Sequence, residues 1–206
     1  ASKGEGLGHK FLSNIRETDA IIHVLRCFDD PNVVHVDGKI NPLSDREVVE
    51  YELIMKDIEI VDKRLDKVKK TLRSGGNEAK KEIEILDRVK LSLESNKVNL
   101  RDFSEDEFKD FIKPLDLISF KPILYVCNVG ESDVVDGNDY VKMVKKEVHD
   151  KSSDVIIISA KIESEINELD SLEEKQMFLD DLGLEESGSN KLIRASYKLL
   201  NLHSYF

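Results

Sequence analysis

Residues 122–131 read PILYVCNVGE, and this stretch decides the fold class. Its apolar first part, 122–127, predicts a buried strand, because short apolar runs bounded by turn residues are typical of parallel sheets. Two similar runs, at 20–25 and 155–158, predict further strands, and we expect the first of them to be buried on both faces. Strands of this kind alternating with helices favour an α/β fold with a parallel sheet.

Helical patterns occupy the segments around these strands. Helices are expected over 141–148, 163–181 and 190–201, where apolar residues recur at helical spacing. A short helical face is also expected over 11–15. Residues 1–8, by contrast, contain three glycines, and we expect them to lack regular structure.

A heptad pattern sets residues 45–99 apart from the rest of the chain. Each of two stripes places apolar residues three or four positions apart, with charges between them. The first stripe consists of Ile54, Ile58, Val61, Leu65, Val68 and Leu72, and the second of Ala79, Ile83, Leu86, Val89 and Leu93. A glycine turn at 74–77 separates them, which predicts an antiparallel coiled-coil helical hairpin. Ser44 and Glu47 predict a capping box at its start.

The hairpin interrupts the α/β pattern, which indicates that it is an insertion into an α/β domain. We expect residues 1–44 and 100–206 to form one α/β domain, with 45–99 inserted between its first two visible strands. No apolar run approaches the roughly 18 residues of a membrane span. The two cysteines, Cys27 and Cys127, lie in apolar runs and are expected to be buried free thiols in a reducing cytoplasm.

Charge is distributed unevenly along the chain. The net charge is −11, and residues 100–206 carry 23 acidic against 13 basic side chains. An acidic body repels nucleic acid, so an RNA contact requires a local basic patch. The hairpin carries one candidate patch, and a solvated helix face remains the alternative. Its members are Lys63, Arg64, Lys67, Lys69, Lys70 and Arg73.

Two polar loops follow the predicted strands directly. Asn128, Val129, Gly130 and Glu131 come after the strand at 122–127. Ser159, Ala160 and Lys161 come after the strand at 155–158. Ligands of open α/β sheets bind at the carboxyl ends of strands, so a purine base could lie between these loops. An asparagine amide can bond a purine edge, and a lysine stem can cover the ring; alone, each motif is also compatible with an ordinary loop.

A phosphate-binding loop is missing from the sequence. No Gly-x-x-x-x-Gly-Lys-Ser/Thr occurs, and the one Gly-Lys pair, Gly38-Lys39, is followed by Ile40. Such a loop supplies backbone N–H groups, a lysine and a hydroxyl to the phosphates and Mg²⁺. The chain as given is therefore expected to lack phosphate and metal ligands, and we assign no catalytic or metal-binding residue.

Taken together, the motifs resemble a known family. The glycine-rich opening at 2–8 and the segment around 11–28 are similar to the switch II region and following strand of the YchF branch of Obg-related P-loop NTPases. Residues 121–128, 159–163 and 182–194 continue the resemblance, and the hairpin lies where that family carries a coiled-coil insertion. The resemblance covers nearly the whole chain.

This resemblance implies a nucleotide hydrolase of which the chain is one part. It implies ATP or GTP with Mg²⁺ as ligands of the full-length protein, whereas the family's phosphate loop and its small C-terminal TGS domain lie outside this sequence. It also implies a switch II role for Lys3, Gly4, Gly6 and Gly8. The chain alone is expected to be inactive.

The base loop departs from the guanine-specific pattern. Asn128-Val129-Gly130-Glu131 stands where guanine-specific relatives carry Asn-Lys-x-Asp, and losing a guanine clamp costs ATP nothing. The resemblance therefore implies ATP preference, while the alternative is that Glu131 only caps the next turn. The partners expected are a purine nucleotide and a ribosome or RNA at the hairpin tip, with no membrane contact. We expect a cytoplasmic monomer. A second hypothesis is a non-catalytic module that docks to ribosome or protein.

Overall fold

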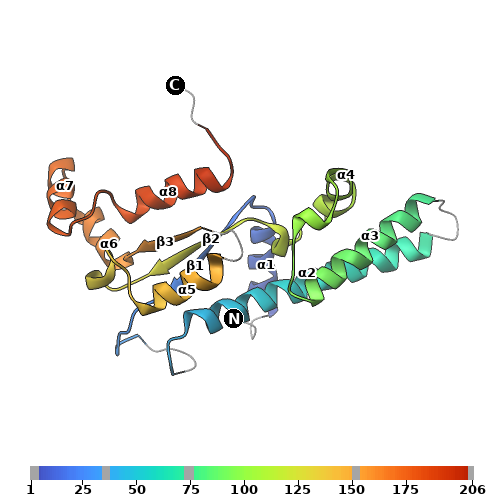
Figure 1. Cartoon of the computed structure of the whole chain (residues 1–206), viewed down its shortest axis with the longest axis horizontal. Coiled ribbons are helices and arrows are strands. Elements are labelled where there is room, and N and C mark those ends of the chain that lie inside the picture. Colours follow the sequence, from blue (N-terminus) through green and yellow to red (C-terminus); the bar gives the residue numbers. More distant parts are fainter. Residues whose placement is uncertain (1–4, 34–37, 72–76, 150–153, 204–206) are drawn as a thin grey trace. The chain divides into compact units, whose positions relative to one another are not determined.

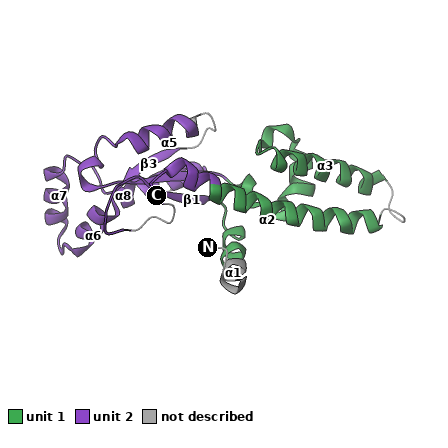
Figure 2. Ribbon diagram, turned by 90° about the horizontal axis from the view of Figure 1, so that it is seen from below, with its two compact units in different colours: residues 1–19, 48–121 green, residues 20–47, 122–206 purple. Residues whose placement is uncertain are grey.

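The computed structural model describes residues 5–33, 38–71, 77–149 and 154–203 (Figure 1). The chain divides into two compact units (Figure 2). Unit 1 comprises Ala1–Asp19 and Val48–Lys121, and unit 2 comprises Ala20–Glu47 and Pro122–Phe206. These boundaries differ from the expected ones, because residues 1–19 and 100–121 group with the hairpin.

Unit 2 is built on a parallel sheet of three strands. The strands are β1 (Ile21–Arg26), β2 (Ile123–Asn128) and β3 (Val155–Ile158), in the order β1-β2-β3. Arg26 is in register with Asn128, and Asn128 with Ile158. The predicted parallel α/β sheet is confirmed, and the carboxyl ends of all three strands lie at one edge.

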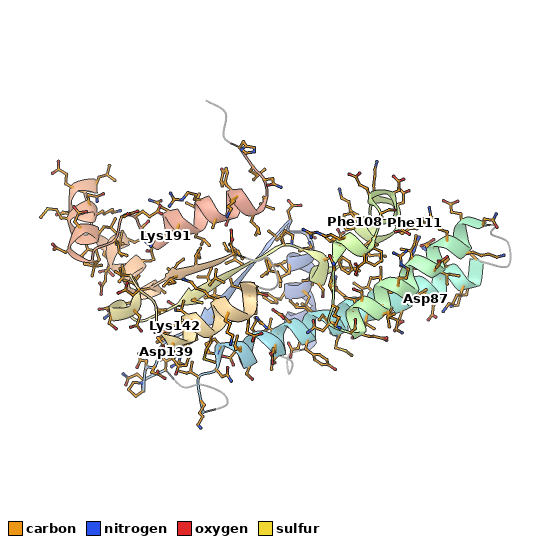
Figure 3. All side chains as sticks on the ribbon, viewed as in Figure 1. Asp87, Phe108, Phe111, Asp139, Lys142 and Lys191 are labelled. Atoms are coloured by element: carbon orange, nitrogen blue, oxygen red, sulfur yellow. The ribbon has the colours of Figure 1, made fainter. Side chains whose placement is uncertain are left out.

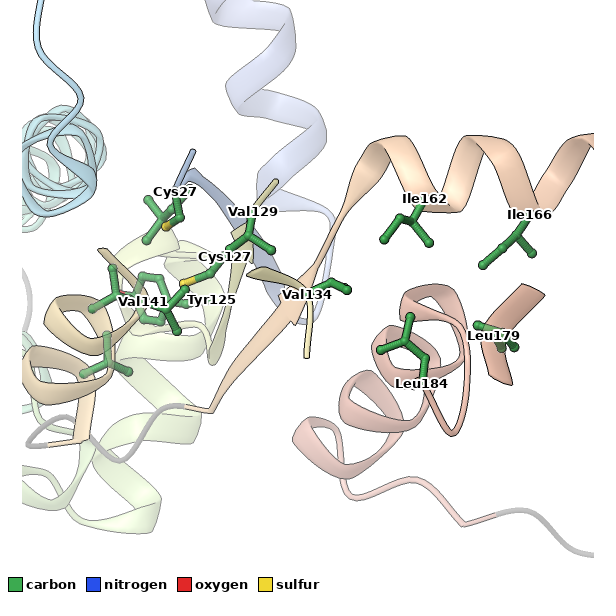
Figure 4. Close-up of a cluster of buried hydrophobic side chains, with 13 residues drawn as sticks. Cys27, Tyr125, Cys127, Val129, Val134, Val141, Ile162, Ile166, Leu179 and Leu184 are labelled. Atoms are coloured by element: carbon green, nitrogen blue, oxygen red, sulfur yellow. The ribbon is translucent and has the colours of Figure 1, made fainter. Parts of the chain in front are cut away.

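Helices cover the two faces of this sheet differently. Residues of α5 (Asp139–His149), α6 (Ala160–Glu168) and α7 (Leu172–Asp181) belong to the same hydrophobic core as Tyr125 and Cys127 on one face of β2. Figure 4 shows the core that they form. On the other face, α8 (Gly188–Leu199) packs onto the sheet, its side chains contacting Leu124, Val126 and Ile158.

The expectation that the first strand is buried on both faces is wrong for β1. Ile22 is 45% exposed and Val24 60%, whereas Leu25 is buried. Both exposed residues pair in register with Leu124 and Val126, on the face that α8 covers only over β2 and β3. An apolar run predicts a strand, but which neighbours cover it depends on the rest of the fold.

The helix expected over 163–181 is two helices. It divides into α6 and α7 at Leu169, and Ser171 begins α7 with a capping box to Glu174. Ser171 accepts from the Glu174 N–H at 3.1 Å, and the Glu174 carboxylate accepts from the Ser171 N–H at 3.1 Å. A reciprocal cap satisfies two backbone donors and ends any continuous helix there.

Unit 1 contains the expected helical hairpin. Its helices are α2 (Pro42–Thr71), whose first six residues belong to unit 2, and α3 (Asn77–Glu94). Most of the predicted seam is buried, namely Ile54, Val61, Leu65, Val68, Leu86, Val89 and Leu93. Three stripe residues, Ile58, Ala79 and Ile83, are only partly buried, and the buried seam also includes Ile85, which the stripes omit. Ion pairs Arg64–Glu82 (2.6 Å) and Lys90–Asp62 (2.7 Å) join the two helices. Leu72 and residues 74–76 of the turn predicted at 74–77 lie outside the described residues, whereas Asn77 begins α3.

The start of α2 differs from the prediction. The helix begins at Pro42 rather than after Ser44, and the Asn41 side chain accepts from the Ser44 N–H at 3.3 Å. Proline suits a first helical position because its missing N–H would have no helical partner there. Ser44 is therefore inside the helix and is not its cap.

Residues 100–121 pack onto the hairpin instead of returning directly to the sheet. They form short turns: η1 (Leu100–Asp102), α4 (Glu105–Glu107), the π-helical η2 (Phe108–Ile112), η3 (Lys113–Leu115) and η4 (Ile118–Phe120). Phe103, Ile112, Leu117 and Phe120 join the hairpin core. Figure 3 marks Phe108 and Phe111, and the Lys81 ammonium lies 5.7 Å from the Phe111 ring.

Helix α1 (Glu5–Arg16) is also fixed within unit 1. Arg16 pairs with the fully buried Asp57 at 2.8 Å, and the second Asp57 oxygen accepts from the Ser119 N–H at 2.7 Å. Lys121 donates to carbonyl groups at the end of α1. Residues 5–8, expected to be irregular, are helical, although a glycine in a helix costs about 1 kcal/mol relative to alanine.

Cys27 and Cys127 are free and fully buried, as predicted. A hydrogen bond to Cys127, together with burial, raises the pKa of the Cys27 thiol. Within the described part of the chain, no helix is both long and apolar enough to cross a membrane.

Candidate nucleotide-base site

The two predicted base loops lie side by side at the carboxyl edge of the sheet. The Ala160 N–H donates to the Asn128 side-chain oxygen at 3.0 Å. One residue after Asn128, the Val129 N–H donates to the carbonyl of Ile158, the last residue of β3, at 2.9 Å. The pairing of β2 with β3 therefore brings together residues that lie about thirty positions apart in the sequence.

The side chains of these loops differ in what they can offer a ligand. Ser159 is 2% exposed and Val129 is 3% exposed, so both can contribute only through their backbone. The buried Ser159 hydroxyl has no hydrogen-bond partner among the described residues. Asn128, Gly130, Glu131, Ala160 and Lys161 are more accessible. A ligand at this edge would therefore meet an amide, a carboxylate and an ammonium.

An ion pair bridges the two loops. Lys161 pairs with Glu131, and both side chains are well exposed. The hydrogen bond from Lys161 to Glu131 raises the pKa of the lysine. Exposed pairs contribute little to stability because water screens them, so this pair is free to rearrange around a ligand. The Glu131 carboxylate engages Lys161 rather than capping the turn η5 (Glu131–Asp133), which has no side-chain cap.

Asn138 links the same edge to β1, and the sequence reading missed it. Its amide donates to the Cys27 carbonyl at 2.7 Å and to Asp133 at 2.8 Å. Its side-chain oxygen accepts from the Val141 N–H at 3.2 Å, in the first turn of α5. The sequence could have indicated this role, because Asn138 directly precedes a helical pattern, which is the typical position of an N-cap residue.

Comparison with known proteins identifies the family that this chain resembles over its whole length. No protein-family model matches the chain. It is 49% identical over 209 residues to the ribosome-binding ATPase YchF of Bacillus subtilis, and 43% identical over 207 residues to that of Escherichia coli O157:H7. Both alignments cover the whole chain. The structure matches that of the Schizosaccharomyces pombe YchF GTPase with a TM-score of 0.84 and 33% identity over 98% of the chain.

The chain belongs to the YchF family. It spans 57% of the length of the Bacillus subtilis relative, 56% of the Escherichia coli relative and 55% of the Schizosaccharomyces pombe chain. The resemblance read from the sequence is thus confirmed, and so is the P-loop NTPase character of the sheet.

The residues with an expected switch II role are only partly described. Lys3 and Gly4 lie outside the described residues. Gly6 and Gly8 lie in the first turns of α1, in unit 1. Their role in a YchF protein stays a prediction.

The basic residues of the hairpin differ in how much charge they present. Arg64 is neutralised by Glu82 at 2.6 Å, and Arg73 lies outside the described residues. The remaining four, Lys63, Lys67, Lys69 and Lys70, are exposed and make no ion pair within the described part of the chain. Lys80 and Lys81, exposed in the first turns of α3, add to them. We call these six lysines the tip lysines.

Proposed function

We propose that the complete YchF-family protein to which this chain belongs binds ATP in preference to GTP, with the purine base held between residues 128–131 and 159–161. It hydrolyses the nucleotide with Mg²⁺, which phosphate- and metal-binding residues outside this chain would hold. The observation that carries the proposal is the 3.0 Å bond from the Ala160 N–H to Asn128, which joins the two loops. The relatives named ribosome-binding ATPases support the activity and a cytoplasmic setting.

The geometry favours a base that accepts hydrogen bonds from Asn128. Because Ala160 occupies the side-chain oxygen, the amide presents its NH₂ group, which suits a purine ring nitrogen. Guanine also presents N1–H and 2-amino donors, which need a free carboxylate. Glu131 is paired with Lys161, so guanine must compete with that lysine for the carboxylate, whereas adenine need not. Because the pair is exposed, this competition disfavours guanine by no more than about 1 kcal/mol.

A pair of substitutions in the complete protein tests the base site. Asn128→Ala removes the amide and is expected to weaken ATP binding about 5- to 150-fold, since a good base contact contributes roughly 1–3 kcal/mol. Ser159→Ala is the matched control, because its hydroxyl has no partner among the described residues; its Kd should stay within about twofold of wild type. Titration with fluorescent ATP and GTP measures both. Equal affinity of the two variants would rule out a base contact by Asn128.

The 206-residue chain by itself is expected to hydrolyse neither ATP nor GTP. Positioning of the phosphates and Mg²⁺ provides most of the rate in phosphoryl transfer, and this sequence has no phosphate-binding loop. Phosphate release would be assayed with each nucleotide and Mg²⁺ on the purified chain. Turnover that follows the chain through successive columns would contradict the expectation.

We further propose that the tip lysines contact ribosomal RNA. They are exposed cations on a chain of net charge −11, and they lie outside the packing seam of the hairpin. The second candidate function, a non-catalytic docking module, rests on the same lysines. It predicts ribosome binding that ATP leaves unchanged, whereas the ATPase proposal allows the nucleotide to alter it.

A further inference from the structure

Glu163, on α6, joins the base loop to the start of α8. Its carboxylate accepts from the Gly188 N–H at 2.6 Å, the Ser189 N–H at 2.9 Å and the Ser189 hydroxyl at 2.6 Å. The first N–H groups of a helix have no partner within it, and the helix dipole makes that end positive. A carboxylate here therefore makes charge-assisted bonds, which are stronger than neutral ones.

Gly188 allows α8 to begin directly against the end of β3. A Cβ atom at this position would lie 2.7 Å from the Cγ2 atom of Ile158 and 2.9 Å from the Glu163 carboxylate. Neither approach is possible for a real side chain without movement. Ile158 immediately precedes Ser159, so this close contact adjoins the start of the base loop at 159–161.

A continuous series of contacts leads from this junction to the base site. Helix α8 is held on the sheet because Leu192, Ala195 and Leu199 pack against Leu124, Val126 and Ile158. Glu163 bonds to the first turn of that fixed helix, and it lies one turn after Ala160 in α6. The Ala160 N–H in turn holds the Asn128 side chain at 3.0 Å.

We propose that Glu163 is a positioning residue for purine binding. By tying the first turn of α6 to α8, it holds the Ala160 N–H where it orients the Asn128 amide toward the base. The carboxylate is occupied by α8 and acts through Ala160 and Asn128. Holding binding groups in place before the ligand arrives reduces the cost of ordering them. This inference rests on the proposed base site.

The test compares two ligands of the complete protein. A non-hydrolysable ATP analogue uses both base and phosphate contacts, whereas tripolyphosphate uses the phosphate contacts alone. Glu163→Gln replaces one acceptor oxygen by an NH₂ group facing the α8 donors. It is expected to weaken the analogue about tenfold and to leave tripolyphosphate within about twofold of wild type, because only the base side is disturbed. Gly188→Ala, which forces the same junction apart, should give the same pattern.

Glu168→Gln is the control, since this exposed glutamate lies at the far end of α6. A second readout needs no nucleotide: hydrogen exchange of the Ala160 amide should be about tenfold faster in Glu163→Gln, with α5 amides unchanged. It therefore tests the positioning step even if the base-site proposal fails. Should Glu163→Gln not fold, Gly188→Ala carries the same comparison.

The outcomes separate the two proposals. Analogue affinity unchanged in both variants, or analogue and tripolyphosphate weakened equally, would overturn the role of Glu163. A wild-type protein that binds tripolyphosphate as tightly as the analogue would overturn the base site itself. Unchanged exchange at Ala160 would overturn the positioning step whatever the nucleotide results.

Discussion

Replacing Asp57 by alanine is expected to lower the free energy of unfolding of unit 1 by about 3–5 kcal/mol, the usual cost of removing one partner of a buried ion pair. Asp57 is fully buried, and its two oxygens serve Arg16 and the Ser119 N–H at 2.8 and 2.7 Å. Alanine removes an acceptor from both donors and breaks the ion pair that joins α1 to α2, while the bonds from Lys121 to the end of α1 remain.

Hydrogen exchange of α2 and α3 peptides measures this loss, because it reports the opening free energy of the unit rather than of the whole protein. Asp62→Ala is the matched control. Asp62 also pairs with a cation, Lys90 at 2.7 Å, but its side chain is 46% exposed. An exposed pair is worth about 0–1 kcal/mol. Equal effects of the two substitutions would show that the Asp57 contacts do not hold unit 1 together.

Reversing three tip lysines, Lys63→Glu, Lys67→Glu and Lys70→Glu, is expected to abolish co-sedimentation with ribosomes. These positions are exposed and recur at helical spacing on α2, so they form one stripe. Three or four phosphate contacts would make wild-type binding about 20- to 150-fold weaker at 200 mM than at 50 mM salt. The substituted side chains lie outside the seam, so the circular dichroism spectrum should not change.

A charge-matched control comes from α5. Reversing Lys142, Lys145 and Lys146 to glutamate changes the net charge equally on three exposed residues of unit 2. Figure 3 marks Lys142 beside its partner Asp139, 2.9 Å away. This variant should sediment with ribosomes like wild type. If instead the hairpin variant co-sediments normally at both salt concentrations, the tip lysines are only a solvated face.

The sequence was most informative where local pattern and topology agree. The apolar runs predicted β2 and β3, and the polar residues that end them predicted two loops at the carboxyl edge of the sheet, because parallel strands bring their carboxyl ends together. The bond from Ala160 to Asn128 within that edge was not predicted. The heptad stripes also predicted most of the buried seam of the hairpin, although not Ile85. Both inferences need only the side-chain period of a strand or helix.

Contacts between residues far apart in the sequence could not be predicted from local patterns. Asp57 stands among the apolar residues of α2, yet its partners lie 41 and 62 positions away and nothing local indicates them. The same holds for Glu163 and Gly188, 25 positions apart. The burial of Val129 could have been predicted from the sequence, because Val129 continues the alternation by which Tyr125 and Cys127 point into the core. The base-loop reading instead assigned it to the ligand.

The most direct test of the central claim is hydrogen exchange of the Ala160 and Lys161 amides in the complete protein, with and without saturating ATP. If the base lies between residues 128–131 and 159–161, ATP at about 100 times its Kd should slow these amides about tenfold or more. Tripolyphosphate should leave them unchanged. Exchange that is identical with and without bound ATP would place the base elsewhere and contradict the account.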